Sequence, residues 1–106
     1  MNQELITLNE VFNEGHTIYF YKVETTGTWV TYGYSAYLLA HLDKVNHLAG
    51  FSCQMQMPCV SVSEADFKKF LSENRDRFAT KDGSYLCGVD ICVDEEKYQL
   101  WVNNLK

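Results

Sequence analysis

The sequence has little of what divides a chain into separate parts. It contains one proline, six glycines and no low-complexity tract, so it offers no obvious linker. No segment repeats at the spacing of about 20 to 50 residues that marks solenoids and tandem arrays. Of its 106 residues, 46% are hydrophobic and 14% aromatic, which is enough to build one core. The composition therefore predicts a single domain covering residues 1–106.

Long hydrophobic runs are also missing. No apolar run approaches the roughly 18 residues that a membrane-spanning helix requires. The first ten residues, MNQELITLNE, carry acidic side chains where a secretion signal would begin with basic ones. We therefore expect a cytoplasmic protein that makes no contact with a membrane.

Basic side chains are scarce. Nine lysines and arginines stand against fourteen aspartates and glutamates, which gives a net charge of −5. This balance opposes nonspecific attraction to nucleic acid, because that attraction comes from cations that displace phosphate counterions. The densest charge cluster, Glu64 to Arg77, mixes both signs and is typical of the solvated face of a helix.

The four cysteines lack the spacing of a metal or redox site. None forms a Cys-x-x-Cys pair, and all lie in strand-like apolar runs, which predicts reduced thiols in the core and not a disulfide framework. Cys92 is expected to be the most accessible of the four, which are Cys53, Cys59, Cys87 and Cys92.

Several catalytic and metal-binding patterns are absent as well. His41 and His47 are six residues apart, off the spacing that places two ligands on one helical face. The phosphate-binding pattern Gly-x-x-x-x-Gly-Lys-Ser/Thr does not occur. Asp90, with Asp94 or Glu95 nearby, suggests a carboxylate site, but surface acids explain these residues better. We therefore expect no catalytic residue, metal or cofactor. A small hydrolase or nuclease remains an alternative that requires a cleft with two or more converging carboxylates, or Cys87 or Cys92 beside a histidine in an open pocket.

Hydrophobic periodicity predicts alternating helices and strands. Leu5, Leu8 and Phe12 recur at helical spacing, and Asp94 and Ser63 stand where helix caps are expected. The predicted helices cover residues 3–14, 34–46, 64–77 and a C-terminal segment after Asp94; the predicted strands cover 18–23, 28–32, 53–62 as one broken or two short strands, and 85–93. The fold class is therefore α/β of the α+β type. It has a mixed β-sheet opened by an antiparallel hairpin, helices packed on it, and the order α-ββ-α-β(β)-α-β-α.

Aromatic residues concentrate between Ile18 and Leu42, where the hairpin pattern runs into a helical one. Three short stretches here match motifs of a known family: an aromatic strand ending Phe-Tyr-Arg, a Gly-Asp-Phe-Tyr-Glu turn and strand, and a leucine-rich helix opening near Asp-Ala. A later family segment, Met-x-Gly-Ile/Val-Pro-Tyr-His, is echoed too. The matching stretches are residues 20–22, 27–31, 35–39 and 57–63. On these residues the chain resembles the N-terminal mismatch-recognition domain of the DNA mismatch repair protein MutS, over residues 3–93.

The resemblance implies a MutS N-terminal-like fold, as in small stand-alone bacterial relatives of this domain, and a nucleic-acid-reading pair on the hairpin. In the family, the Phe of Phe-x-Glu wedges beside a mispaired base and the Glu hydrogen-bonds that base. Trp29 stands at the Phe position and keeps an aromatic ring. Thr31 stands at the Glu position and lacks the reach of the carboxylate. Lys22 replaces an arginine, keeping the charge without the planar fork.

These departures favour an interaction domain without enzymatic activity over a mismatch reader. Under this hypothesis the aromatic hairpin contacts a protein partner or a second copy of the chain, with Tyr32, Tyr34 and Tyr37 as candidate contacts. DNA or RNA binding through Trp29, Thr31 and Lys22, linked to DNA repair, is the alternative. A purely structural role is also open for Trp29, as a cross-strand partner of neighbouring tyrosines.

Overall fold

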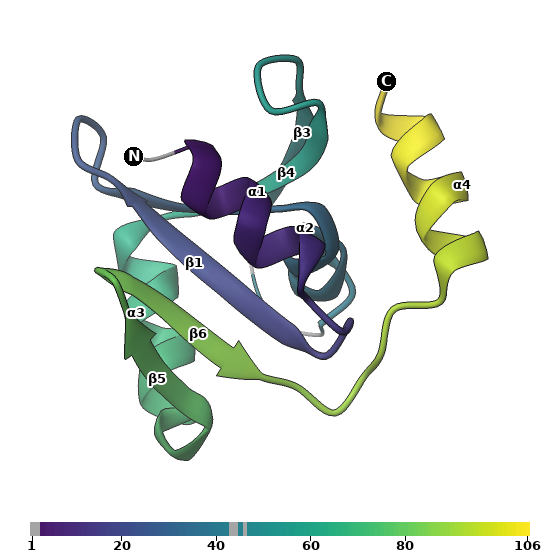
Figure 1. The fold of residues 1–106 in the computed structure, drawn as a ribbon. Helices are drawn as coiled ribbons and strands as arrows, with labels where there is room; N and C mark the ends of the chain where they lie inside the picture. The colour runs from purple at the N-terminus through teal and green to yellow at the C-terminus, as the bar shows by residue number, and fades with distance from the viewer. Residues whose placement is uncertain (1–2, 43–44, 46) are drawn as a thin grey trace.

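The protein is described by a computed structural model that covers residues 3–42, 45 and 47–106. Within these residues, helices and strands follow one another in ββα units after a first helix (Figure 1). The elements are α1 (Gln3–Val11), β1 (Thr17–Val23), β2 (Thr28–Tyr32), α2 (Gly33–Ala40), β3 (Leu48–Ser52), β4 (Met57–Val62), α3 (Glu64–Glu73), a 3-10 turn η1 (Arg75–Arg77), β5 (Phe78–Lys81), β6 (Ser84–Gly88) and α4 (Glu95–Leu105).

The strands form one six-stranded sheet in the order β3-β4-β2-β1-β6-β5. The predicted hairpin is present and central, with Tyr21 opposite Val30 and Lys22 opposite Trp29. The α+β fold class and the element order are confirmed. The strand directions differ from the expected mixed sheet, because all five pairings are antiparallel. The two strands of each ββα unit pair as a hairpin, and the hairpins meet through β2 with β4 and through β1 with β6, which also run antiparallel.

The sheet is covered unequally on its two faces. Side chains of β1 alternate, so Ile18 and Phe20 join one buried cluster and Tyr21 joins another. The larger cluster is covered by α2, α3 and α4. The smaller one is covered by α1, which contributes Ile6. Figure 1 shows α1 running alongside β1, with α3 behind β5 and β6.

The larger cluster is largely aromatic. The ring of Phe20 contacts Phe67 edge to face at a centroid distance of 5.0 Å, and the rings of Phe70 and Phe78 each lie 5.9 Å away. These residues come from β1, α3 and β5, so the aromatic contacts hold the central hairpin to an edge hairpin and to the helix between them. Such edge-to-face and offset pairs add to the free energy gained from burial alone.

Two predicted caps are confirmed. The amide of Asp66 donates to the Ser63 hydroxyl at 3.1 Å, and the amide of Lys97 donates to the Asp94 carboxylate at 3.2 Å. Each bond satisfies an amide that has no partner within the first turn of its helix. The starts of α3 and α4 are therefore encoded locally.

Several predicted boundaries are wrong. Of the strand segment predicted over residues 53–62, residues 57–62 form β4 as expected, but residues 53–56 are the turn between β3 and β4, where Gln56 has φ = 56°. The predicted strand over 85–93 stops at Gly88, and β3 and β5 lie where no strand was expected. Alternation of apolar residues does not distinguish a strand from a turn or an extended segment that packs on the core. The predicted end of α2 is also too late, since α2 ends at Ala40; residues 43, 44 and 46 of that prediction lie outside the described residues.

Among the described residues, no helix is both long enough and apolar enough to cross a lipid bilayer.

Candidate functional site

Trp29, the candidate wedge, lies inside the protein, on the face of the sheet that α2, α3 and α4 cover. Its side chain is 5% exposed and stacks on the ring of Phe67 at a centroid distance of 4.1 Å. Its indole N–H donates to the carboxylate of Glu64 at 3.1 Å. Tyr85 contacts it edge to face, so the tyrosine neighbours are not those on β1 that the hairpin pattern suggested.

Thr31 and Lys22 lie on the same face of the hairpin. The Thr31 side chain is fully buried, and its hydroxyl donates to the carbonyl of Val60 at 2.9 Å. The Lys22 ammonium lies 3.7 Å from the Glu64 carboxylate and 5.9 Å from the centre of the Trp29 ring. The three candidate nucleic-acid-binding residues thus make structural contacts with α3 and β4 in this conformation.

The three candidate partner-contact tyrosines do not form one surface. The ring of Tyr34 contacts Tyr98 edge to face at 4.9 Å, and its hydroxyl donates to Glu95, which raises the pKa of that hydroxyl to about 12. Tyr37 is buried and packs against His41 and Trp101. Both residues therefore help to hold α4 against α2.

Tyr32 lies on the opposite face of the sheet, beside α1. Its ring is half-buried against Tyr21, and burial raises the pKa of its hydroxyl. Together with Gln3, Ile6, Gln54 and Met55 it lines a small cleft of about 100 Å³ between the start of α1 and the turn after β3.

A buried polar cluster connects α1 to α2, and the sequence analysis did not identify it. The two carboxylate oxygens of Glu10 accept hydrogen bonds from the Ser35 amide at 3.2 Å and from the Ser35 hydroxyl at 2.5 Å. The side-chain amide of Asn13 donates to the carbonyl of Thr17 at 2.8 Å. One feature of the sequence pointed to this cluster, because four residues recur at the spacing of one helical face: Ile6, Asn9, Glu10 and Asn13. Polar residues at that spacing normally predict a side of the helix that faces solvent.

Burial has the largest effect on the pKa of Glu10. It raises the pKa of this carboxyl from 4.5 to about 7, although the hydrogen bonds from Ser35 and Asn13 act in the opposite direction. The acidic group therefore changes its charge near neutral pH inside the domain.

The outer side of α1 is apolar, which reverses the usual arrangement of a surface helix. Leu8, Val11 and Phe12 are 53%, 70% and 75% exposed. The predicted helix is confirmed, but its expected apolar stripe through Leu8 and Phe12 faces outward, while Asn9 and Glu10 are buried. A shallow surface depression of about 380 Å³ on this outer side is lined by Gln3, Glu4, Thr7, Leu8 and Val11. We call Leu8, Val11 and Phe12 the α1 apolar face.

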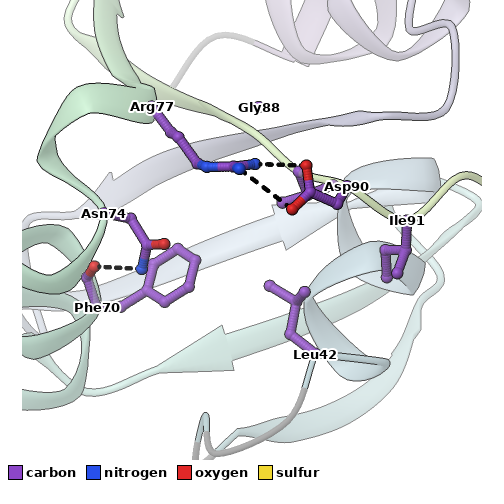
Figure 2. Close-up of a pocket in the computed structure, with 8 residues that line it drawn as sticks. Leu42, Phe70, Asn74, Arg77, Gly88, Asp90 and Ile91 are labelled. Carbon is purple, nitrogen blue, oxygen red and sulfur yellow. Dashed lines mark hydrogen bonds and ion pairs between the residues drawn. The ribbon is translucent and has the colours of Figure 1, made fainter.

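A second depression lies on the other side of the sheet, between the end of α3 and the segment after β6 (Figure 2). Its volume of about 230 Å³ is below the roughly 300 Å³ from which small-molecule sites usually start. The Arg77 guanidinium makes a two-pronged ion pair with Asp90 at 2.9 and 3.1 Å, and the Asn74 amide donates to the carbonyl of Phe70. The rim is therefore engaged in contacts within the protein.

The cysteines are free, as predicted, but they are not all in the core. Cys87 is buried, Cys59 is half-buried, and Cys53 and Cys92 are exposed. Cys53 is exposed because it lies in the turn after β3, and Cys92 because the ladder has already ended at Gly88. In the part of the chain that the structure describes, no three His, Cys, Asp or Glu side chains are arranged to hold a metal ion.

Comparisons of the chain with protein-family models, with curated proteins and with solved structures found no match. The relation to MutS therefore stays a prediction made from the hairpin motifs.

Proposed function

We propose that this chain is a non-enzymatic interaction domain, related to the mismatch-recognition domain of MutS, that binds a protein partner through the α1 apolar face. The observation that carries the proposal is the inverted burial of α1. Three large apolar side chains point outward, while Asn9 and Glu10 face the sheet. Exposed apolar clusters of this kind mark interaction sites, because covering them removes apolar surface from water.

The surface next to α1 supports the same location for the binding site. The cleft that includes Tyr32 and Met55 adjoins the start of α1, so a partner on α1 reaches half-buried aromatic and methionine side chains as well. Methionine adapts its shape to a bound surface, and tyrosine adds contact area at low entropic cost. The interaction surface thus combines a helix side with the adjacent end of the sheet.

The absence of enzymatic activity is part of the proposal. Glu10, Asn13 and Ser35 form the most chemically distinctive cluster, yet they are buried and hydrogen-bonded to one another. Their arrangement is that of a structural link that caps α2. The four free thiols support the cytoplasm as the expected compartment, since reduced cysteines persist there.

DNA binding remains the competing function, and two observations weigh against it. Trp29 is buried against Phe67, and the Lys22 ammonium is already paired with Glu64. The net charge of −5 adds a general repulsion from phosphate.

Site-specific photo-crosslinking tests the proposal. A photoreactive phenylalanine analogue at position 12 should give a covalent adduct with another protein, and the added substitutions Leu8→Ser and Val11→Ser should abolish that adduct. The same analogue at Leu100, a 63% exposed residue on α4, is the matched control and should give none.

A duplex-binding measurement addresses the competing function. Matched and mismatched DNA duplexes at low salt should show no submicromolar binding to the chain. Salt-sensitive duplex binding that Lys22→Ala removes, without any adduct at position 12, would replace the protein-binding proposal with the DNA one.

A further inference from the structure

The two edges of the sheet are protected to different degrees. β5 forms one edge and β3 forms the other (Figure 1). An edge strand presents backbone N–H and C=O groups to which another strand can add, and proteins block this addition with charge, proline or a short strand. β5 has four residues, ends at Lys81 and follows Arg77. Its sequence therefore opposes the addition of a strand.

β3 has none of the charge or proline that protects an edge. Its five residues, Leu48–Ser52, read Leu-Ala-Gly-Phe-Ser. Among the described residues, no strand pairs with its outer side. The Leu48 side chain is 75% exposed, and a Cβ added at Gly50 would have no non-neighbouring atom of the described residues within 4 Å. β3 therefore offers an uncharged edge that a further strand can reach.

The side chains of β3 alternate between the two faces of the sheet. Gly50 lies opposite Cys59, so it belongs to the face that carries α1. Phe51 belongs to the other face, where the Lys106 ammonium lies 5.2 Å from the centre of its ring. Residues directly opposite each other in an antiparallel pair point to the same side. A second sheet added antiparallel at β3 therefore continues both faces.

We infer that β3 pairs with β3 of a second copy of the chain, antiparallel and centred on Gly50, so that two six-stranded sheets join into one. This register sets Leu48 opposite Ser52 of the second copy and Ala49 opposite its Phe51, so a large side chain meets a small one in each pair. The two Gly50 residues meet at the two-fold axis, where neither adds a side chain. Each copy supplies the same surface, as a closed symmetric dimer requires. The inference does not depend on the α1 apolar face.

Charge and size favour a second copy over an unrelated extended segment. The net charge of −5 would oppose self-association if it lay at the contact, but none of it lies on β3. Like charges therefore do not face each other across the paired strands. Any added strand must place small residues opposite Leu48 and Phe51, and β3 itself carries them in the required order.

Disulfide trapping tests the pairing. Directly opposite residues of antiparallel strands have Cα atoms about 4.5 to 5.5 Å apart, within the range that a disulfide spans. Gly50→Cys should therefore link two copies covalently in a buffer of oxidised and reduced glutathione. Cys53, Cys59 and Cys92 are first replaced with serine, because Cys59 lies opposite position 50 within one chain and the other two are exposed.

Leu48→Cys in the same background is the matched control. Position 48 lies on the same strand and the same face and is more exposed, but the register places it roughly 13 Å along the strand from its own copy. It should therefore form at least about tenfold less linked dimer than Gly50→Cys. A mixture of Leu48→Cys and Ser52→Cys should link, because these two positions face each other across the pair.

Sedimentation of the native chain tests the same contact without an added thiol. A standard interface has roughly 20 to 30 residues a side, so pairing through one strand should be weak and should become visible between about 0.05 and 1 mM. Leu48→Lys adds the charge with which edge strands avoid pairing, and it should lower the dimer fraction at least about fivefold. Thr80→Lys adds the same charge on the opposite edge and should leave the dimer unchanged. Circular dichroism of each variant establishes that it is folded.

Three results would overturn the inference. A native chain that is monomeric at about 1 mM, with position 50 linking no better than position 48, excludes the pairing and leaves the proposed function standing. Preferred linking at position 48 excludes the antiparallel register centred on Gly50. A dimer that Leu8→Ser with Phe12→Ser abolishes and Leu48→Lys keeps assigns self-association to the α1 apolar face instead.

Discussion

The hydroxyl of Ser35 donates a hydrogen bond to the carboxylate of Glu10 at 2.5 Å, and this bond joins the first helix to the start of the second. The same hydroxyl accepts from the Tyr19 amide at 2.9 Å. Glu10 thus links α1, β1 and α2 through one buried group. Its charge state bears on the stability of the whole N-terminal half.

Stability should fall as the pH rises through neutrality because of Glu10. Its pKa is about 7 in the folded protein and 4.5 in its ordinary state, so between these values the folded protein holds a proton that the unfolded chain has lost. The stabilisation is present below pH 4.5 and is lost as the pH rises through about 7, with a total of about 3 kcal/mol at most. Urea unfolding of the native chain and of Glu10→Gln between pH 5 and 8.5 measures the difference, which should widen in favour of the variant at high pH.

Glu73→Gln is the control for that experiment, because Glu73 is an exposed carboxylate on α3. Its unfolding free energy should follow that of the native chain at every pH. If Glu10→Gln also ran parallel to the native chain, the buried carboxyl would not titrate in this range.

Trp29→Ala should destabilise the fold by roughly 3 to 5 kcal/mol, because a large buried ring is removed from the stack on Phe67. Denaturant titration followed by circular dichroism gives the value. Leu100→Ala, at an exposed apolar position, should change it by less than about 0.5 kcal/mol. A small effect at Trp29 would mean that the ring does not occupy the core.

Thr31→Glu introduces the carboxylate that the MutS motif carries at this place, and it should not confer mismatch reading. The position is fully buried, so an ionised side chain there would lose its contact with water, at a cost on the order of 4 kcal/mol or more. Thr31→Val loses only the hydrogen bond to Val60, roughly 1 kcal/mol. Thermal unfolding should rank the native chain first, Thr31→Val second and Thr31→Glu last; a stable Thr31→Glu that binds mismatched duplexes would contradict this ranking.

Thiol labelling should follow burial. Cys53 and Cys92 are exposed and should react quickly with a disulfide reagent at pH 8, while Cys59 should react more slowly. Cys87 is buried, and burial raises the pKa of its thiol to about 11, so it should react only on unfolding. Replacing Cys53 and Cys92 with serine should remove the fast phase, as read by mass spectrometry; a fast phase that persisted would place Cys59 or Cys87 at the surface.

Structural features that depend on neighbouring residues were predicted reliably from the sequence. The central hairpin from Ile18 to Tyr32 and the caps at Ser63 and Asp94 were predicted correctly, because strand alternation and capping depend on neighbours along the chain. The segments 53–56 and 89–93 were misassigned, because they have the alternation of a strand although the first is a turn and the second lies beyond the end of β6.

At the candidate site, too, the sequence predicted the local structure but not the tertiary packing. The motif around Trp29 and Thr31 identified a hairpin, but the sequence could not reveal that α3 covers the face on which both residues lie. Nor could it reveal the outward apolar face of α1, because a stripe at helical spacing normally predicts burial. Asn9 and Glu10 take the inner side since β1 and α2 offer them partners at Tyr21 and Ser35.

The sequence by itself determined an acidic α+β chain with its element order, its central hairpin and its helix starts, because composition, periodicity and caps act over short distances. Only the tertiary structure decided that the sheet is antiparallel throughout, that Trp29 belongs to the core, and that the outer side of α1 is the exposed apolar face. These outcomes depend on which surfaces meet when distant segments pack, and burial and hydrogen-bond satisfaction are properties of that packing.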